Sequence, residues 1–193
     1  TSFVGMYTRA TAPVGSSGNP RSDALESLHH TPLDQKIVST QGASFTWLAN
    51  SFDLHARALS VTRSSSLGYS KSETTAYHDN TAKWMLGQVA SVTDSSGAVE
   101  RQTTYNATTA LPTASYAFGL LLETYSFYAN GLLNVRYDAA GRGTTYTNYQ
   151  RGIPQNTAYP NATAQSATVN SLGLVTSITN EAGTTTGYGY DAV

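Results

Sequence analysis

The side chains that could catalyse a reaction are few and scattered along the chain. His29 and His30 could ligate a metal, but adjacent positions on a helix or strand point in different directions, and no Asp, Glu or His lies at ligand spacing from them. His55 follows Asp53, with Ser51 nearby, yet no Gly-x-Ser-x-Gly turn is present to expose a serine nucleophile. We therefore interpret these histidines as loop residues and expect no metal site.

A pair of carboxylates could instead hydrolyse a glycosidic bond by acid–base catalysis. The candidates are Glu100, Glu123, Asp138 and Glu181. Asp138 and Glu181 fall in expected turns, where a carboxylate caps the backbone or is solvated, whereas Glu123 lies in a strand-like run. A glycosidase is thus the least favoured of the alternatives, and no cofactor is expected.

Aromatic side chains are the remaining candidates for ligand binding. Tyr125, Tyr128, Tyr146 and Tyr149 lie at strand spacing, and if they were exposed on one face they could stack on sugar rings. The competing interpretation, which we favour, is a set of cross-strand ladders that hold the register of a sheet. A carbohydrate or cell-wall binding module that uses an exposed Tyr/Trp face stays open as the second hypothesis.

Composition narrows the class of protein. The 193 residues carry only 12% charged side chains and a net charge of −1, which argues against nucleic-acid binding through phosphate contacts. Abundant Thr, Tyr and Gly favour an all-β fold over a helical bundle. The absence of cysteine excludes disulfides, zinc ribbons and thiol nucleophiles. No apolar window of about eighteen residues exists, so no membrane insertion is expected.

The N-terminal part differs from the rest of the sequence. Residues 1–40 are expected to form an irregular segment, with a possible short helix at Ser22–Leu28. Residues 41–193 are expected to form β-hairpin repeats. The chain does not begin with Met and has no signal peptide, which we interpret as a piece of a longer exported chain.

An internal repeat organises the second half. Residues 86–97 and 172–183 align without a gap and share Leu, Gly, Val, Ser, Thr and a closing Gly. Each copy predicts a strand, a four-residue turn and a Thr-rich return strand. Asp or Asn would open the turn by accepting backbone N–H groups, and Gly would close it with a positive φ. The two turns run from Asp94 to Gly97 and from Asn180 to Gly183.

A second motif reads Tyr-Asp-Ala-Ala-Gly-Arg at residues 137–142, and its first residues recur at the C-terminus. The tyrosine would end a strand, the aspartate would cap the turn, and the glycine would take the left-handed conformation. Successive hairpins would then pair edge to edge as an antiparallel meander, forming a long twisted or spiralling sheet. The residues to which we assign this structural role are Tyr137, Asp138, Gly141, Arg142, Tyr190 and Asp191.

These motifs resemble the YD-repeat, or Rhs (rearrangement hotspot), family over about residues 44–193, most closely after residue 84. The stretch from Tyr77-His78-Asp79 to Val89 is also similar to a segment of long bacterial Rhs proteins. The sequence departs from the family at Gly143, where a larger strand residue is usual, and at residues 108–115 and 153–167. The resemblance implies a hollow β-shell, which in many members encloses a C-terminal toxin and in eukaryotic relatives supports cell adhesion.

We therefore expect a non-catalytic scaffold: a fragment of an exported bacterial shell, at the cell surface or outside the cell. The expected partners are the remainder of the parent shell and its payload, and neither nucleic acid nor membrane is among them. Edge-to-edge self-association is also expected, because the strand over residues 184–190 has no Lys, Glu or Pro to blunt an open edge.

Overall fold

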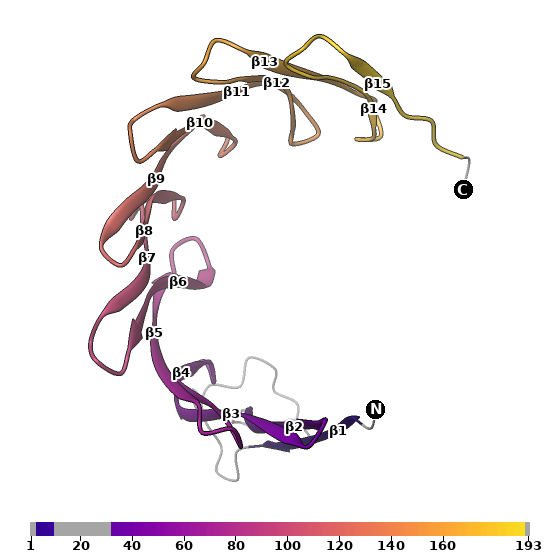
Figure 1. The fold of residues 1–193 in the computed structure, drawn as a ribbon. Coiled ribbons are helices and arrows are strands. Elements are labelled where there is room, and N and C mark those ends of the chain that lie inside the picture. Colours follow the sequence, from indigo (N-terminus) through magenta and orange to yellow (C-terminus); the bar gives the residue numbers. More distant parts are fainter. Residues whose placement is uncertain (1–2, 10–31, 192–193) are drawn as a thin grey trace, which may run out of the picture. The chain divides into compact units, whose positions relative to one another are not determined.

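The computed structural model describes residues 3–9 and 32–191, and at residues 3–9 it describes the backbone alone (Figure 1). This part of the chain contains fifteen β-strands and no helix, and each strand lies beside its neighbours in chain order. The all-β meander of antiparallel hairpins predicted from the sequence is confirmed. Within these residues there is accordingly no helix long and apolar enough to cross a membrane.

The chain divides into two compact units, which are described separately. The first comprises Thr1–Thr103 with Ala117–Gly119, and the second comprises Thr104–Tyr116 with Leu120–Val193. Most of the first unit is made by β1 (Phe3–Arg9), β2 (Leu33–Thr40), β3 (Ala43–Phe52), β4 (Ala58–Ser65), β5 (Ser70–Asn80), β6 (Met85–Asp94) and β7 (Val99–Tyr105).

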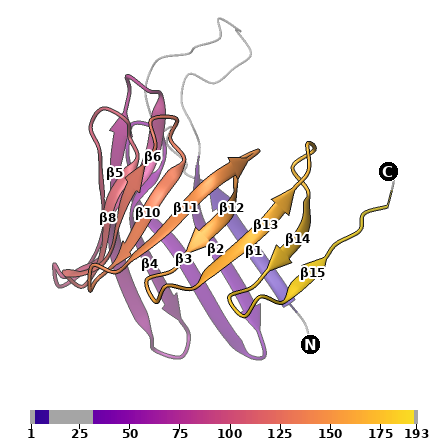
Figure 2. The ribbon, with the colours of Figure 1, turned by 90° about the horizontal axis from the view of Figure 1, so that it is seen from above.

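The second unit contains most of β8 and all the strands that follow. These are β8 (Pro112–Ala117), β9 (Leu120–Phe127), β10 (Leu133–Asp138), β11 (Gly143–Gln150), β12 (Ile153–Ala158), β13 (Ala164–Val169), β14 (Val175–Thr179) and β15 (Thr185–Gly187). Figures 1 and 2 show the hairpins of each unit following one another along its sheet.

Two parts of the N-terminal segment form strands. Where an irregular segment was expected over residues 1–40, the described residues form β1 and β2, paired antiparallel with Phe3 opposite Thr40, and residues 10–31 lie outside the description. The sequence gives little sign of this pair because no short turn joins the two strands, and hairpin signals act only over short connections. The helix expected at Ser22–Leu28 lies outside the described residues.

One five-residue loop turns most of the hairpins. In the loop that starts at Asp138, the N–H of Asp138 donates to the carbonyl of Arg142 (3.1 Å), and the N–H of Gly141 donates to the carbonyl of Asp138 (2.9 Å). Gly141 has a φ of 76°, which is the geometry of a type I turn followed by a left-handed residue in a bulge. The same pattern occurs at residues 53–57, 65–69, 94–98, 128–132, 159–163, 170–174 and 180–184.

The sheet has little hydrophobic core. Among the described residues no large side chain is fully buried, and no helix or second sheet covers the strands. Backbone ladders, cross-strand side-chain pairs and turns must therefore carry most of the stability. The buried apolar residues are Ala49, Val92, Ala110, Ala114 and Val169.

The two faces of the first unit differ in chemistry. One face, here called the hydroxyl face, carries Ser and Thr side chains that bond across the strands. Examples are Ser39 with Ser44 (Oγ to Oγ, 2.9 Å) and Thr62 with Ser72 (Oγ1 to Oγ, 2.8 Å). Because neighbouring residues of a strand alternate, the other face carries Val38, Phe45, Trp47, Arg63 and Lys71, and we call it the mixed face.

Candidate functional site

The Asp138 side chain organises the turn in which the sequence placed it. Its Oδ1 accepts the backbone N–H groups of Ala140 and Arg142 (both 2.9 Å), and its Oδ2 accepts Nε of Arg142 (2.7 Å). The backbone and side-chain bonds from Arg142 hold the pKa of Asp138 below its usual value, against a smaller opposing effect of burial. A carboxyl group with a lowered pKa is a poor general acid, so this geometry favours a capping role for Asp138.

Tyr137 lies over Gly143, its cross-strand partner on β11. A Cβ on Gly143 would lie 2.9 Å from Cε1 of Tyr137 and 3.0 Å from Cγ1 of Val135. The position therefore has no room for a side chain while the tyrosine ring is in place. This contact explains why glycine stands where the resemblance to the Rhs family led us to expect a larger residue.

Asp94, Gly97, Asn180 and Gly183 lie in the same kind of loop, whereas no turn is formed at Tyr190 and Asp191 in the described residues. Asp94 Oδ1 accepts the N–H groups of Ser96 (2.8 Å) and Ala98 (2.9 Å), and Asn180 Oδ1 makes the equivalent bonds. Gly97 and Gly183 have φ values of 89° and 80°. The hydroxyl of Tyr190 donates to the carbonyl of Val175 (2.7 Å), while Asp191 is the last described residue.

A turn that the sequence analysis did not identify repeats the Asp138 loop bond for bond. Asp53 Oδ1 accepts the N–H groups of His55 and Arg57 (both 2.9 Å), and Oδ2 accepts Nε of Arg57 (2.5 Å). Ala56 takes the left-handed position with a φ of 58°. The sequence signal was Asp followed by Arg four residues later, but alanine replaces the glycine that marks the motif.

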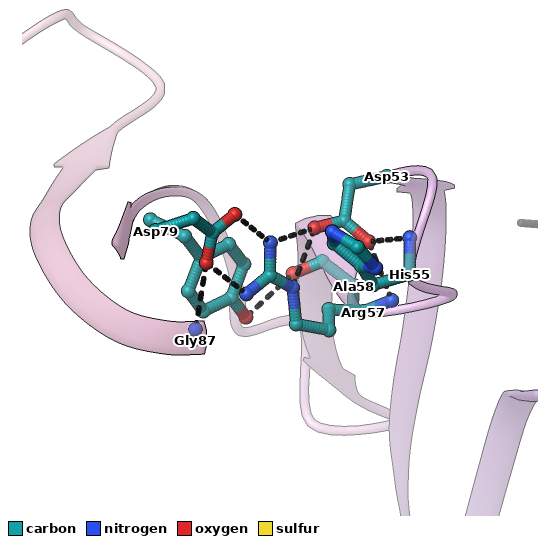
Figure 3. A network of polar contacts seen from close by, with 7 residues as sticks. Asp53, His55, Arg57, Ala58, Asp79 and Gly87 are labelled. Atoms are coloured by element: carbon teal, nitrogen blue, oxygen red, sulfur yellow. Dashed lines mark hydrogen bonds and ion pairs between the residues drawn. The ribbon is translucent and has the colours of Figure 1, made fainter. Parts of the chain in front are cut away.

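Arg57 also joins this turn to the next hairpin along the chain (Figure 3). Its Nη1 and Nη2 donate to Oδ1 and Oδ2 of Asp79, at 2.8 and 2.7 Å, in a bidentate pair. The guanidinium carbon lies 4.3 Å from the ring centroid of Tyr77, and Asp79 Oδ1 accepts the N–H of Gly87 (2.7 Å). We call Asp53, Arg57, Tyr77, Asp79 and Gly87 the Arg57 clasp.

The clasp is largely shielded from solvent. The side chains of Asp53, Arg57 and Asp79 are 15%, 20% and 28% exposed. The Arg57 guanidinium, with the N–H of Gly87, lowers the pKa of Asp79 far below its usual value, and Asp79 in turn raises the pKa of Arg57. Burial would raise the pKa of Asp53, but the hydrogen bonds from Arg57 and His55 outweigh it and lower that pKa. The clasp therefore stays charged over the ordinary pH range and fastens the β3–β4 turn to the β5–β6 hairpin.

A charged cavity of about 780 Å³ opens in the second unit beside the Asp138 turn. Three of the carboxylates weighed as glycosidase candidates line it, namely Glu123, Asp138 and Glu181. Glu123 accepts the hydroxyl of Tyr125 (2.8 Å) and lies 3.6 Å from Arg136, so it is engaged by its neighbours as Asp138 is. Across residues 3–9 and 32–191, no three Asp, Glu or His side chains are placed to hold a metal ion.

The tyrosines considered for sugar stacking are used in packing and in cross-strand bonds. Tyr128 and Tyr149 meet edge to face, with centroids 6.4 Å apart and planes at 81°. The hydroxyl of Tyr128 donates to the carbonyl of Tyr146 (3.1 Å), and that of Tyr149 donates to Leu133 (2.6 Å). Burial raises the pKa of Tyr125 and Tyr149. A stacking platform needs coplanar open rings, and this pair has the opposite arrangement.

Other residues weighed for chemistry have structural surroundings or fall outside the description. Asp53 bonds the backbone of His55 rather than its ring, and that carboxylate is committed to its turn. Asp53 therefore does not orient the ring of His55 as the aspartate of a triad would. His29 and His30 lie outside the described residues.

A family model matches one stretch of this meander. Residues 170–193 match the family described as RHS Repeat, so the resemblance to the Rhs/YD-repeat family that the sequence motifs indicated is confirmed for this stretch. No curated protein matches the sequence.

Several solved structures are similar over most of this chain. A Photorhabdus luminescens Tc holotoxin pore, in a TccC3 mutant form, is 13% identical with a TM-score of 0.47, over 93% of this chain and 10% of that one. A crystal structure of TcdB2-TccC3-Cdc42 is 15% identical with a TM-score of 0.42, over the same shares of 93% and 10%. The chain thus spans about a tenth of the length of these proteins.

Proposed function

We propose that this chain is a non-catalytic wall segment of an exported bacterial Rhs/YD-repeat shell that encloses or displays a toxin or adhesive domain. The observation that carries the proposal is the recurrent five-residue loop, which joins one hairpin after another into the meander. Residues 170–193 of this meander match the RHS Repeat family. Each added strand satisfies the backbone groups of its predecessor, so the architecture can extend without a new core.

The chemistry of the described residues suits a wall better than an enzyme. The hydroxyl face of the first unit presents Ser and Thr side chains that are bonded to one another, for example Thr62 to Ser72. Three of the carboxylates that could have served catalysis are engaged by neighbouring groups: Glu100 by Lys71, Glu123 by Tyr125 and Arg136, and Asp138 by Arg142. The alternative of a carbohydrate-binding module gains no support from Tyr128 and Tyr149, whose rings stand nearly perpendicular.

The partners that follow from this function are the rest of the shell, its payload and, for the isolated chain, a second copy. Among the described residues, β15 pairs with β14 alone, through Thr185–Gly187. Thr184 and Tyr188 bond to the β14 side, so the alternation of an antiparallel ladder points the N–H of Thr185 to the open edge. We expect the isolated chain to associate with increasing concentration in light scattering and Thr185→Pro, which removes that N–H, to prevent it.

Electron microscopy of the secreted parent polypeptide tests the shell directly. The proposal expects a hollow particle whose wall contains this meander, with density for a payload inside it or attached to it. A solid particle, or one in which this segment forms a separate lobe with both faces in solvent, would contradict the wall function.

A further inference from the structure

A groove of about 900 Å³ lies on the mixed face of the first unit. Its apolar lining is unusually open to solvent: Phe45 is 45% exposed, Leu67 is 62% exposed and Tyr69 is 75% exposed. Apolar side chains gathered in this way commonly mark a surface that meets a partner. The apolar and aromatic lining residues are Leu33, Val38, Phe45, Trp47, Leu67 and Tyr69.

A row of three cationic side chains and one tryptophan, here called the cationic row, crosses the groove. Lys36 lies opposite Trp47, Trp47 opposite Arg63, and Arg63 opposite Lys71, so the four form one line across β2, β3, β4 and β5. With strands about 4.8 Å apart, this line is about 14 Å long. All four residues line the groove, and no Asp or Glu is among the described residues that line it.

Two carboxylates form ion pairs with cationic side chains of this row. Glu73 pairs with both Arg63 and Lys71, and Glu100 pairs with Lys71. The cationic side chains are 54% and 51% exposed, whereas those of Glu73 and Glu100 are only 12% and 14% exposed. Like charges directly opposite each other destabilise a sheet, and the two carboxylates offset this while the side chains of Arg63 and Lys71 stay the more exposed partners.

We propose that this groove binds an acidic segment of a partner polypeptide that also carries apolar side chains. The apolar residues would pack on Val38 and Phe45, and the acidic residues would pair with the cationic groups of the row that contains Trp47, two residues further along the strands. A neutral glycan has no negative charge to pair with the cationic row. A nucleic acid has phosphates for the cationic row but little aliphatic surface to pack on the apolar residues. This inference goes beyond the wall function and does not depend on it.

Trp47 is a built-in reporter for the test. The chain has two tryptophans, so Trp84→Phe leaves Trp47, which lines the groove, as its one tryptophan. In this background, a short synthetic peptide of leucine, phenylalanine and glutamate should change the Trp47 emission saturably. The same peptide with lysine in place of glutamate should bind at least about tenfold more weakly, and added salt should lower the affinity of the acidic peptide.

Matched variants separate the groove from the rest of the sheet. Lys36→Glu and Phe45→Ser should each weaken the acidic peptide about tenfold, whereas Thr74→Ala on the hydroxyl face should leave its binding unchanged. Circular dichroism of each variant checks that it folds. The proposal would be overturned if the two peptides bound equally or if neither changed the Trp47 emission. It would also be overturned if anionic lipid vesicles bound as well as the acidic peptide, or if Trp47 were already shielded from iodide without peptide. None of these outcomes bears on the hollow particle that the wall function predicts.

Discussion

Ala56 and Gly141 occupy the same position of the same turn, with φ values of 58° and 76°. Each follows an aspartate by three residues and precedes an arginine whose Nε returns to that aspartate. A left-handed backbone disfavours any side chain with a Cβ, because the Cβ approaches the following carbonyl oxygen. The β3–β4 turn therefore keeps the Rhs-type loop at the cost of strain at Ala56.

This equivalence predicts opposite effects for two exchanges. Ala56→Gly should stabilise the chain by about 0.5–1 kcal/mol, the relief of strain being partly offset by the greater freedom of glycine in the unfolded chain. Gly141→Ala should destabilise it by about 1 kcal/mol through strain alone, since no atom lies within 4 Å of the added Cβ. Urea unfolding of both variants measures this, and a loss of stability in Ala56→Gly would contradict the assignment.

Gly143 should respond differently from Gly141. An added Cβ would meet the Tyr137 ring at 2.9 Å, so Gly143→Ala should cost about 1–3 kcal/mol by overpacking rather than by backbone strain. Gly143→Ala should therefore cost less stability in the Tyr137→Ser background than in the unaltered chain. Strictly additive effects in the double-mutant cycle would show that the ring and the glycine are not coupled.

The Arg57 clasp should contribute more to stability than the equivalent pair at Arg142. Arg57→Met leaves two shielded carboxylates without their cation and should cost about 2 kcal/mol, between the values of exposed and buried ion pairs. Arg142→Met is the matched control, because this arginine is 70% exposed and bonds only its own turn. Urea unfolding should show a clearly smaller loss for Arg142→Met, and equal losses would argue against the clasp.

The same contacts predict how stability depends on pH. The pKa values of Asp53 and Asp79 are lowered in the folded chain, so their contribution is complete above the ordinary carboxyl pKa of about 4. It is lost as the pH falls below that value toward the folded-state pKa, because the unfolded chain then binds more protons. Arg57→Met should flatten this acid limb of the stability curve, and an unchanged slope in urea titrations between about pH 4 and 2 would count against it.

Local turn chemistry explains why so much of the meander could be predicted. Asp94, Asp138 and Asn180 each act on backbone groups within four residues, so their effect is legible in a short stretch of sequence. The Ala56 turn was missed because the glycine that marks the loop is absent. The clasp was missed because Arg57 and Asp79 are 22 residues apart, and only the pairing of β4 with β5 and of β5 with β6 brings them together.

The groove was unpredictable for a related reason. Lys36, Trp47, Arg63 and Lys71 come from four strands, and they form one row only through three successive strand registers. A one-residue shift in any of these registers would move part of the row to the opposite face. Sequence spacing alone therefore cannot place such a row.

The most direct test of the wall function compares two neighbouring residues of β7 that face opposite ways. Arg101 lies opposite Val92 and Gln102 lies opposite Ser91, and both residues are exposed. This segment has no native cysteine, so Arg101→Cys and Gln102→Cys each place one labelling site within it. In the parent polypeptide, a bulky polyethylene-glycol maleimide should label one site readily and the other far more slowly, and both should react alike in the isolated chain. Equal, rapid labelling of both sites in the parent would contradict a shell wall.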